Sequence, residues 1–152
     1  MKGVRVAESD TGHGVFATRQ FRADETIGWV AGTIVDDPKY GSQYCIGIDD
    51  HRALEPAAPF RYLNHSCQPN CVLVMNPPED DDPAAGDIRV DTLREIIAGE
   101  QLTIDYAWPA EVAVPCSCGS PNCRGWIVDA EQVGRVFQWN RDWTERSQEE
   151  RP

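Results

Sequence analysis

The apolar residues of this chain fall in short runs that glycine, proline and acidic residues interrupt every few positions. Runs this short favour β-strands over helices, and several of them alternate between apolar and polar residues. We expect strands at residues 2–7, 27–35, 43–48, 71–75, 87–93 and 101–106. Helical spacing follows only Asp129, which can cap a short helix ending near residue 139. The sequence therefore predicts a mostly β, α+β fold of several short-stranded sheets with a short C-terminal helix.

The segments between these strands are expected to be irregular. Residues 49–52 should form a turn, and residues 53–59, which contain two prolines, an irregular connection. Residues 76–86 are rich in proline and acidic side chains and should form a solvated surface loop. Gly12 and Gly14 would let the backbone approach a ligand closely, although a lone G-x-G favours a plain turn.

Polar side chains are concentrated in residues 61–71, which read RYLNHSCQPNC. The apolar lead-in suggests that the stretch leaves a buried segment and turns near Pro69. Asn64 offers two donors and an acceptor, and a neutral His65 offers one of each. The pair could hold a polar, ring-bearing ligand in one orientation. The same residues are equally compatible with a polar turn that carries two core cysteines.

Three cysteines near the C-terminus follow the spacing C-x-C-x₄-C, with a glycine and a proline to bend the chain. Thiolates this close favour a tetrahedral zinc site over unliganded thiols, and a disulfide between Cys116 and Cys118 would be strained. The third member of the group is Cys123. The candidates for the fourth ligand that zinc requires are Cys67, Cys71, Cys45 and the histidines.

The formal net charge of −11, from 25 acidic and 14 basic residues, argues against partners that need a positive surface. We therefore expect no direct nucleic-acid partner and no membrane partner. A basic, lysine-rich peptide would be favoured at encounter, although acidity also simply keeps proteins soluble. No apolar run approaches the length of a membrane span. The six cysteines then fit a reducing compartment, the cytoplasm, or the nucleus in a eukaryote.

Tyr106 ends an apolar strand just before residues 107–109, where the chain must turn. Its phenol could point into a site, or it could be a core tyrosine with its hydroxyl at the rim. The motifs of serine hydrolases, P-loop proteins and HExxH metalloproteases do not occur in the sequence. Hydrolase and kinase chemistry therefore have no support.

Four segments resemble the motifs of one family in their order along the chain. Residues 12–17 are similar to its G-x-G-V/L-F-A segment, and residues 61–70 to its R-F-x-N-H-S-C-x-P-N signature. Residues 99–106 are similar to its G-E-E-L-T-x-D-Y segment, and residues 116–126 to its C-terminal motif C-x-C-G-x₃-C-R-G-W. The chain thus resembles the SET-domain protein lysine methyltransferases with a post-SET zinc motif.

This resemblance implies an architecture and a cofactor. It implies a SET domain at residues 1–110, a post-SET zinc segment at 111–127, and a C-terminal helix and tail at 128–152. The family transfers a methyl group from S-adenosyl-L-methionine to a lysine amine in a protein or peptide. The residues that match its cofactor-binding positions are Gly12, His13, Gly14, Tyr44, Arg61, Asn64, His65, Tyr106 and Trp126.

Tyr106 matches the catalytic tyrosine at the family's methyl-transfer pore, where its hydroxyl would orient the lysine amine. Direct displacement needs alignment more than a strong base. The lysine must first lose its proton, which desolvation beside a cationic sulfonium would favour. Cys67 matches the family's fourth zinc ligand, which would complete the set of Cys116, Cys118 and Cys123.

Two positions depart from the family. Val30 replaces the pocket tyrosine of many members, and Ile104 replaces an aromatic residue two positions before the pore tyrosine. The lysine pocket is therefore expected to be looser than usual, which leaves the methylation product open. The departures also keep open a second hypothesis beside the methyltransferase, a non-catalytic SET-like peptide-binding module stabilised by zinc. A purely structural zinc domain is disfavoured, because Tyr106, Asn64 and His65 are intact.

Overall fold

A computed structural model describes residues 2–75 and 88–138. This part of the chain consists mainly of short strands, which confirms the predicted mostly β, α+β class. The strands are β1 Val4–Ser9, β2 Gly12–Ala17, β3 Thr26–Trp29, β4 Gly32–Asp36, β5 Ile46–Gly47, β6 Arg52–Pro56, β7 Asn64–His65, β8 Cys71–Met75, β9 Ile88–Thr92, β10 Gln101–Ile104, β11 Val114–Pro115 and β12 Trp126–Ile127. The 3₁₀ turns are η1 Phe60–Tyr62, η3 Ala110–Val112 and η4 Ala130–Gln132. None of the described helical segments has the length and apolar character that crossing a membrane requires.

The described chain forms two compact units. The first contains the residues up to Asn64 and those from Pro69 to Ile104. The second joins residues 65–68 to the chain from Asp105 onward. The polar stretch at 61–71 therefore contributes residues to both units. The domain bounds implied by the family resemblance remain a prediction.

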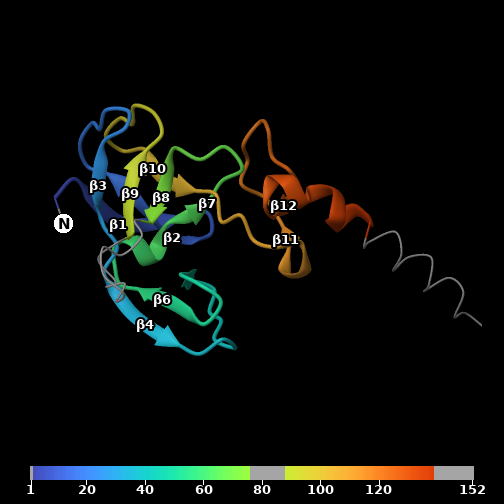
Figure 1. The fold of residues 1–152 in the computed structure, drawn as a ribbon. Coiled ribbons are helices and arrows are strands. Elements are labelled where there is room, and N and C mark those ends of the chain that lie inside the picture. Colours follow the sequence, from blue (N-terminus) through green and yellow to red (C-terminus); the bar gives the residue numbers. More distant parts are fainter. Residues whose placement is uncertain (1, 76–87, 139–152) are drawn as a thin grey trace, which may run out of the picture. The chain divides into compact units, whose positions relative to one another are not determined.

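Three small sheets build the first unit, with strand orders β1-β2-β10-β7, β3-β9-β8 and β4-β6-β5. The β1 and β2 strands form a hairpin, and β4 and β6 run side by side (Figure 1). The core residues Val15, Leu54, Val90 and Leu102 are completely buried, and each lies on a strand of one of these sheets. Burial of such side chains contributes roughly 1.5–3 kcal/mol each, so the strands are held mainly by their apolar faces.

The G-x-G segment is a strand and not the expected turn, so that prediction is wrong. Residues 12–17 pair with β1 on one side, and Val15 and Phe16 pair with β10 on the other. The segment forms a strand because Val15 and Ala17 bury their side chains on one face of the sheet. A lone G-x-G pattern carries no information about the strands with which it pairs.

The structure differs from the prediction in two further segments, because their strands depend on pairing with distant residues. Residues 27–35 are two strands, β3 and β4, that belong to different sheets and separate at Val30 and Ala31. Residues 53–59 were expected to be irregular, yet β6 covers most of them as the middle strand of its sheet. Its proline, Pro56, occupies the last strand position, where a missing N–H does least harm.

The expected strand at 43–48 is reduced to β5, because the Ser42 side chain holds the preceding residues in a turn. The strands β8, β9 and β10 lie where they were expected. Asp129 caps the C-terminal helical segment by accepting the Glu131 N–H at 2.8 Å, and residues 133–138 are α-helical. The expected loop at 76–86 and the predicted end of the helix at 139 lie outside the described residues.

Candidate functional site

In the first unit, Asn64 joins three segments that are distant in sequence. Its Nδ2 donates to the His13 carbonyl at 2.9 Å, to Gln101 Oε1 at 2.9 Å and to Ser9 Oγ at 3.2 Å. These contacts bring the G-x-G segment, the polar stretch and the start of β10 together. The structure thus unites three of the segments on which the family resemblance depends.

Gly14 is required by this arrangement. A Cβ at this position would lie 2.6 Å from Gln101 Oε1 and 3.2 Å from Asn64 Nδ2. The contact with Gln101 Oε1 is closer than a Cβ tolerates and the one with Asn64 Nδ2 is tight, so the Gln101 side chain and its hydrogen bond to Asn64 would have to shift. The glycine therefore permits the close approach of the β2 backbone to the Asn64 amide. The close approach to a ligand that the G-x-G pattern would allow stays a prediction.

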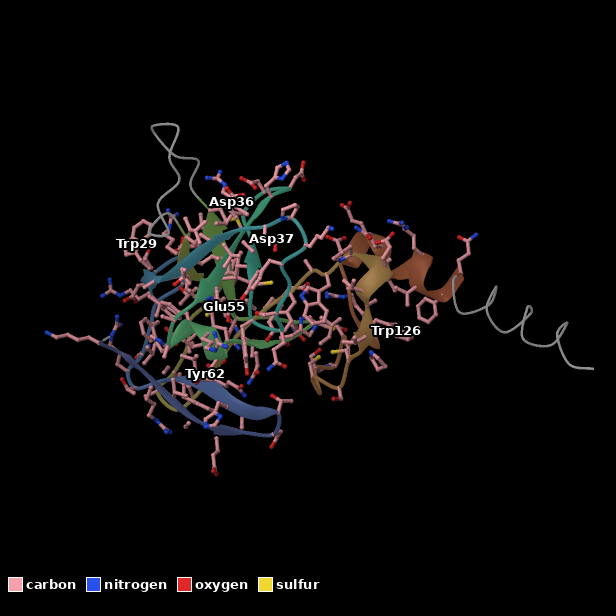
Figure 2. The ribbon with its side chains drawn as sticks, turned by 90° about the horizontal axis from the view of Figure 1, so that it is seen from below. Trp29, Asp36, Asp37, Glu55, Tyr62 and Trp126 are labelled. Atoms are coloured by element: carbon pink, nitrogen blue, oxygen red, sulfur yellow. The ribbon has the colours of Figure 1, made fainter. Side chains whose placement is uncertain are left out.

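Three aromatic side chains and an arginine contact one another in the first unit. The His13 and Tyr62 rings have centroids 5.4 Å apart, and Tyr62 meets the Tyr44 ring edge-on at 6.4 Å. The guanidinium carbon of Arg61 lies 3.9 Å from the Tyr44 ring centroid, and Arg61 forms an ion pair with Glu55. Glu55 and Tyr62 are marked in Figure 2. Flat rings beside hydrogen-bonding groups suit a ligand that carries an aromatic base.

Tyr62 is a further residue of the candidate site, and the sequence pattern did not single it out. It contacts both His13 and Tyr44, two of the predicted residues, so it links them into one cluster. The signal was available, because Tyr62 lies between Arg61 and Asn64 in the polar stretch.

Asn70 locks the end of the polar stretch to β10. Only 3% of this residue is exposed. Its Nδ2 donates to the Gln101 carbonyl at 2.8 Å and to Glu100 Oε1 at 3.0 Å, and its Oδ1 accepts the Thr103 N–H at 2.8 Å. A side-chain amide is the group that can donate and accept in this way at once. Asn70 therefore has a structural role within the first unit.

In the second unit, the sulfurs of Cys67, Cys116, Cys118 and Cys123 all lie within 4.8 Å of one another. The Sγ of Cys67 is 3.8 Å from that of Cys116 and 4.0 Å from that of Cys123. Tetrahedral zinc with Zn–S bonds of about 2.3 Å places neighbouring sulfurs about 3.8 Å apart. The four thiols therefore fit a structural zinc ion in number, type and spacing.

Backbone N–H groups also point at these sulfurs. Cys67 Sγ accepts the Arg124 N–H at 3.4 Å, Cys118 Sγ accepts the Cys67 N–H at 3.5 Å, and Cys123 Sγ accepts the Gly125 N–H at 3.4 Å. Donors aimed at sulfur stabilise the thiolate form that binds metal. Three of the four sulfurs thus accept a backbone N–H.

The pKa values of two of these thiols differ in direction. Burial raises the pKa of Cys116 to about 12. Burial acts in the same sense on Cys118, but hydrogen bonds from Cys67 and Ser120 outweigh it and lower the pKa of that thiol to about 6. Four adjacent thiolates repel one another, so a bound dication is needed to ionise all of them.

Cys45 and Cys71 do not join this group. Cys71 is buried on β8 in the first unit, where burial raises the pKa of its thiol to about 12. Cys45 is in the same unit, and its Sγ accepts the Ser42 N–H at 3.4 Å. Of the alternatives that spacing left open among the cysteines, only Cys67 lies beside the three-thiol motif.

His65 connects this sulfur cluster to Tyr106. Its Nδ1 accepts the Tyr106 backbone N–H at 3.1 Å, and its Nε2 lies 3.3 Å from Cys67 Sγ. Burial lowers the pKa of His65, and it outweighs the nearby carboxylate of Asp105. The imidazole is therefore neutral near pH 7, and its partners place the hydrogen on Nε2.

Tyr106 is half-buried between two rings. Its ring centroid is 5.4 Å from that of His65, and it stacks on Trp108 at 5.5 Å with an interplanar angle of 28°. The next residue, Ala107, has a left-handed backbone with φ 46°. Such a conformation is costly for alanine and turns the chain directly after the tyrosine.

Asp105 is a second residue that the sequence reasoning did not select. Its Oδ1 accepts the Ala107 N–H at 3.0 Å and an Arg124 Nη2 hydrogen at 2.7 Å. Arg124 Nη2 also donates to the Val128 carbonyl at 2.9 Å. The carboxylate therefore supports the turn after Tyr106. Its place immediately before Tyr106 was the available signal.

The remaining predicted residues are also located. Trp126 lies on β12, where it pairs with Pro115, and is half-buried (Figure 2). Val30 is completely buried and 7% of Ile104 is exposed, so both positions that depart from the family pattern are packed in the core of the first unit. The expectation of a looser lysine pocket stays a prediction.

The sequence matches one known protein family over most of the first unit and the start of the second. A family model described as a SET domain matches residues 12–107. Histone-lysine N-methyltransferase trithorax of Drosophila virilis is 34% identical over 131 residues, which cover 76% of this chain and 3% of the relative. Histone-lysine N-methyltransferase, H3 lysine-4 specific, of Schizosaccharomyces pombe is 35% identical over 91 residues, which cover 57% of this chain and 10% of the relative. The chain thus spans a small part of these relatives.

Solved structures show the same fold. KRYPTONITE, solved in complex with mCHG DNA and SAH, superposes with a TM-score of 0.70 at 21% identity, over 82% of this chain and 28% of its own. A second KRYPTONITE structure, with mCHH DNA, an H3(1-15) peptide and SAH, has the same TM-score and identity, over 82% of this chain and 29% of its own. At this identity the similarity concerns the fold alone.

Proposed function

Because this chain belongs to the SET-domain family, we propose that it transfers a methyl group from S-adenosyl-L-methionine to a lysine side-chain amine in a protein or peptide. The observation that carries the proposal is the hydrogen bond from Asn64 to the His13 carbonyl, which joins two motifs 51 residues apart. The named methyltransferase relatives support the same activity.

The cofactor is proposed to bind through the residues that match the family's positions. When bound, the cofactor supplies an electrophilic methyl group on a sulfonium. Rings and backbone carbonyls can hold such a cation without a formal negative charge. The matching residues that belong to the first unit are Gly12, His13, Gly14, Tyr44, Arg61 and Asn64. Those that belong to the second unit are His65, Tyr106 and Trp126.

Tyr106 is proposed to orient the lysine amine through its hydroxyl. Its backbone N–H is held by His65, and the turn that follows is held by Asp105, so the ring is supported on both sides within the second unit. Positioning of this kind can supply several kcal/mol of a displacement barrier, about 7–11 in the best cases. We assign no general base, because a desolvated lysine beside a positive charge loses its proton more readily.

Zinc is proposed to be structural and to be held by Cys67, Cys116, Cys118 and Cys123. Four protein ligands leave no open position for chemistry at the metal. The metal would instead fix the segment that carries Cys67, and with it His65, whose Nε2 lies 3.3 Å from the Cys67 sulfur.

The substrate is proposed to be a lysine-containing protein or peptide, and a basic one is favoured. The chain has a net charge of −11, which attracts basic segments. An H3 peptide is bound in a protein of the same fold. None of the six cysteines, all of which lie in the described part of the chain, forms a disulfide, which fits a reducing compartment such as the cytoplasm or the nucleus.

The experiment that tests this function has two stages. Isothermal titration measures binding of S-adenosyl-L-methionine, and a peptide array incubated with labelled cofactor then detects transfer to lysine. Binding followed by label on lysine-containing peptides is the expected result. Cofactor or peptide binding without transfer to any lysine would favour the non-catalytic peptide-binding module instead.

A further inference from the structure

We propose that Glu55 is a positioning residue of the cofactor site, whose carboxylate sets both the backbone and the ring of Tyr44. The inference rests on the proposed function, in which Tyr44 and Arg61 contact the cofactor. Glu55 lies on β6, the middle strand of the sheet β4-β6-β5 (Figure 2). Tyr40, Ser42 and Arg61 all donate hydrogen bonds to its carboxylate. Ser42 and Arg61 also contact the backbone and the ring of Tyr44, respectively.

The Glu55 carboxylate is engaged at both oxygens. Oε2 accepts the Ser42 hydroxyl at 2.6 Å and the Tyr40 hydroxyl at 3.0 Å, and Oε1 accepts Arg61 Nη1 in an ion pair. The hydrogen bond from Ser42, with those from Tyr40 and Arg61, lowers the pKa of Glu55 against the opposing effect of burial. The carboxylate is therefore ionised at neutral pH.

Ser42 transmits the position of this carboxylate to the backbone of Tyr44. Its Oγ donates to Glu55 and accepts the N–H groups of Tyr44 at 3.1 Å and Cys45 at 3.0 Å. A hydroxyl has one hydrogen and two lone pairs. With the hydrogen directed at Glu55, both lone pairs face the two backbone donors, and the turn before β5 is defined.

Arg61 transmits the same position to the Tyr44 ring. The guanidinium carbon lies 3.9 Å from the ring centroid while Nη1 is bonded to Glu55. An arginine without such an anchor samples many rotamers, so Glu55 keeps the guanidinium over the ring. The ring in turn meets Tyr62, which contacts His13. Glu55 thus supports one end of the aromatic cluster.

The charge of Glu55 matters as well as its shape. A glutamine has one carbonyl oxygen and one amide NH₂ at the same positions. Its NH₂ would face either Arg61 or the two hydroxyls, and each of these is already a donor. Glu55→Gln is therefore nearly isosteric, yet it cannot satisfy both sides.

The test compares Glu55→Gln with Asp50→Asn. Asp50 is exposed in the turn before β6, so its substitution changes the net charge equally without touching this network. Four quantities are measured in the full chain: the Kd of S-adenosylhomocysteine, the kcat, the KM for the cofactor, and the hydrogen exchange of the Tyr44 and Cys45 amides.

We expect Glu55→Gln to weaken S-adenosylhomocysteine binding on the order of tenfold, as for loss of a charge-assisted hydrogen bond. The KM for the cofactor should rise while kcat at saturation stays near that of the parent. The Tyr44 and Cys45 amides should exchange faster, and Asp50→Asn should match the parent throughout. Parent-like affinity and parent-like exchange in Glu55→Gln would overturn the inference.

Two controls separate the possible failures. If the parent itself does not bind the cofactor, the proposed function is wrong, and unchanged amide exchange would independently show that Glu55 does not hold Tyr44. If Glu55→Gln does not fold, Ser42→Ala removes only the connection to the backbone. In that variant the Tyr44 and Cys45 amides should exchange faster and cofactor binding should weaken. Amide exchange as slow as in the parent would contradict the role of Glu55.

Discussion

His65 accepts the backbone N–H of Tyr106 through Nδ1 at 3.1 Å, while its Nε2 lies 3.3 Å from the Cys67 sulfur. One buried imidazole therefore connects the sulfur cluster to the proposed catalytic tyrosine inside the second unit. Both ring nitrogens have partners within the protein, so the imidazole supports Tyr106 in addition to the place proposed for His65 in the cofactor site.

We predict that His65→Ala lowers the free energy of unfolding by about 1–3 kcal/mol, because the Tyr106 N–H loses its acceptor. Urea unfolding of the metal-loaded protein measures the change. His65→Asn retains a side-chain acceptor and should recover part of the loss. An alanine variant as stable as the parent would show that the hydrogen bond contributes nothing.

We predict that Cys67→Ser abolishes stoichiometric zinc binding, because a hydroxyl is a poor replacement for the fourth thiolate. Metal analysis of the purified protein, expected to give one zinc per parent chain, measures the effect. Cys71→Ser is the matched control, since Cys71 is buried on β8 and does not belong to the four-cysteine cluster. Zinc retained by Cys67→Ser and lost from Cys71→Ser would reverse the assignment.

Patterns among residues that are close in sequence predicted a strand, the start of a helical segment and a metal cluster. Alternation located β9, and a cap at Asp129 located the start of the C-terminal helical segment. The spacing of Cys116, Cys118 and Cys123 indicated a metal cluster, and the resemblance rather than the spacing selected Cys67. These signals depend on residues that are close in sequence.

Pairings between distant segments could not be predicted in this way. The two prolines of residues 53–59 favour an irregular connection, and only the two neighbours of β6 in the sheet make most of this segment a strand. Tyr62, Asp105 and Glu55 were not selected, since each acts through partners on other segments. Side-chain networks of this kind have no periodic signature in a single sequence.

We predict that Glu100 makes stability depend on pH. Burial acts to raise the pKa of Glu100, but hydrogen bonds from Arg94, Asn70 and the Ile97 N–H outweigh it and lower the pKa below 4.5. A lowered pKa means that the ionised carboxylate stabilises the fold above the unfolded value and loses this effect as pH falls through the folded value.

Glu100→Gln should therefore be less stable than the parent near pH 7, and the difference should shrink as the pH falls through the lowered pKa of the folded parent's carboxyl. Urea unfolding of both proteins, from pH 7 down to acid pH, measures this difference in the free energy of unfolding. Glu95→Gln, at an exposed carboxyl nearby, serves as the control. A difference that stays constant down to the lowest pH would mean that the ionised form of Glu100 is not what stabilises the fold.

The last prediction concerns the Tyr106 hydroxyl. Tyr106→Phe removes one oxygen and keeps the ring that stacks on Trp108 and contacts His65. A net intramolecular hydrogen bond contributes about 0.5–1.5 kcal/mol to stability. A hydrogen bond that aligns a transition state can cost roughly 10²–10³-fold in rate when it is removed. Stability and turnover should therefore respond very differently.

The most direct measurement is single-turnover methyl transfer from labelled S-adenosyl-L-methionine to a substrate peptide found on the array, for the parent and for Tyr106→Phe at equal cofactor occupancy. We predict that the phenylalanine variant melts within a few degrees of the parent and binds the cofactor with similar affinity. Its transfer rate should be lower by roughly 10²–10³-fold. A transfer rate equal to the parent's would contradict the assignment of Tyr106 and the mechanism built on it.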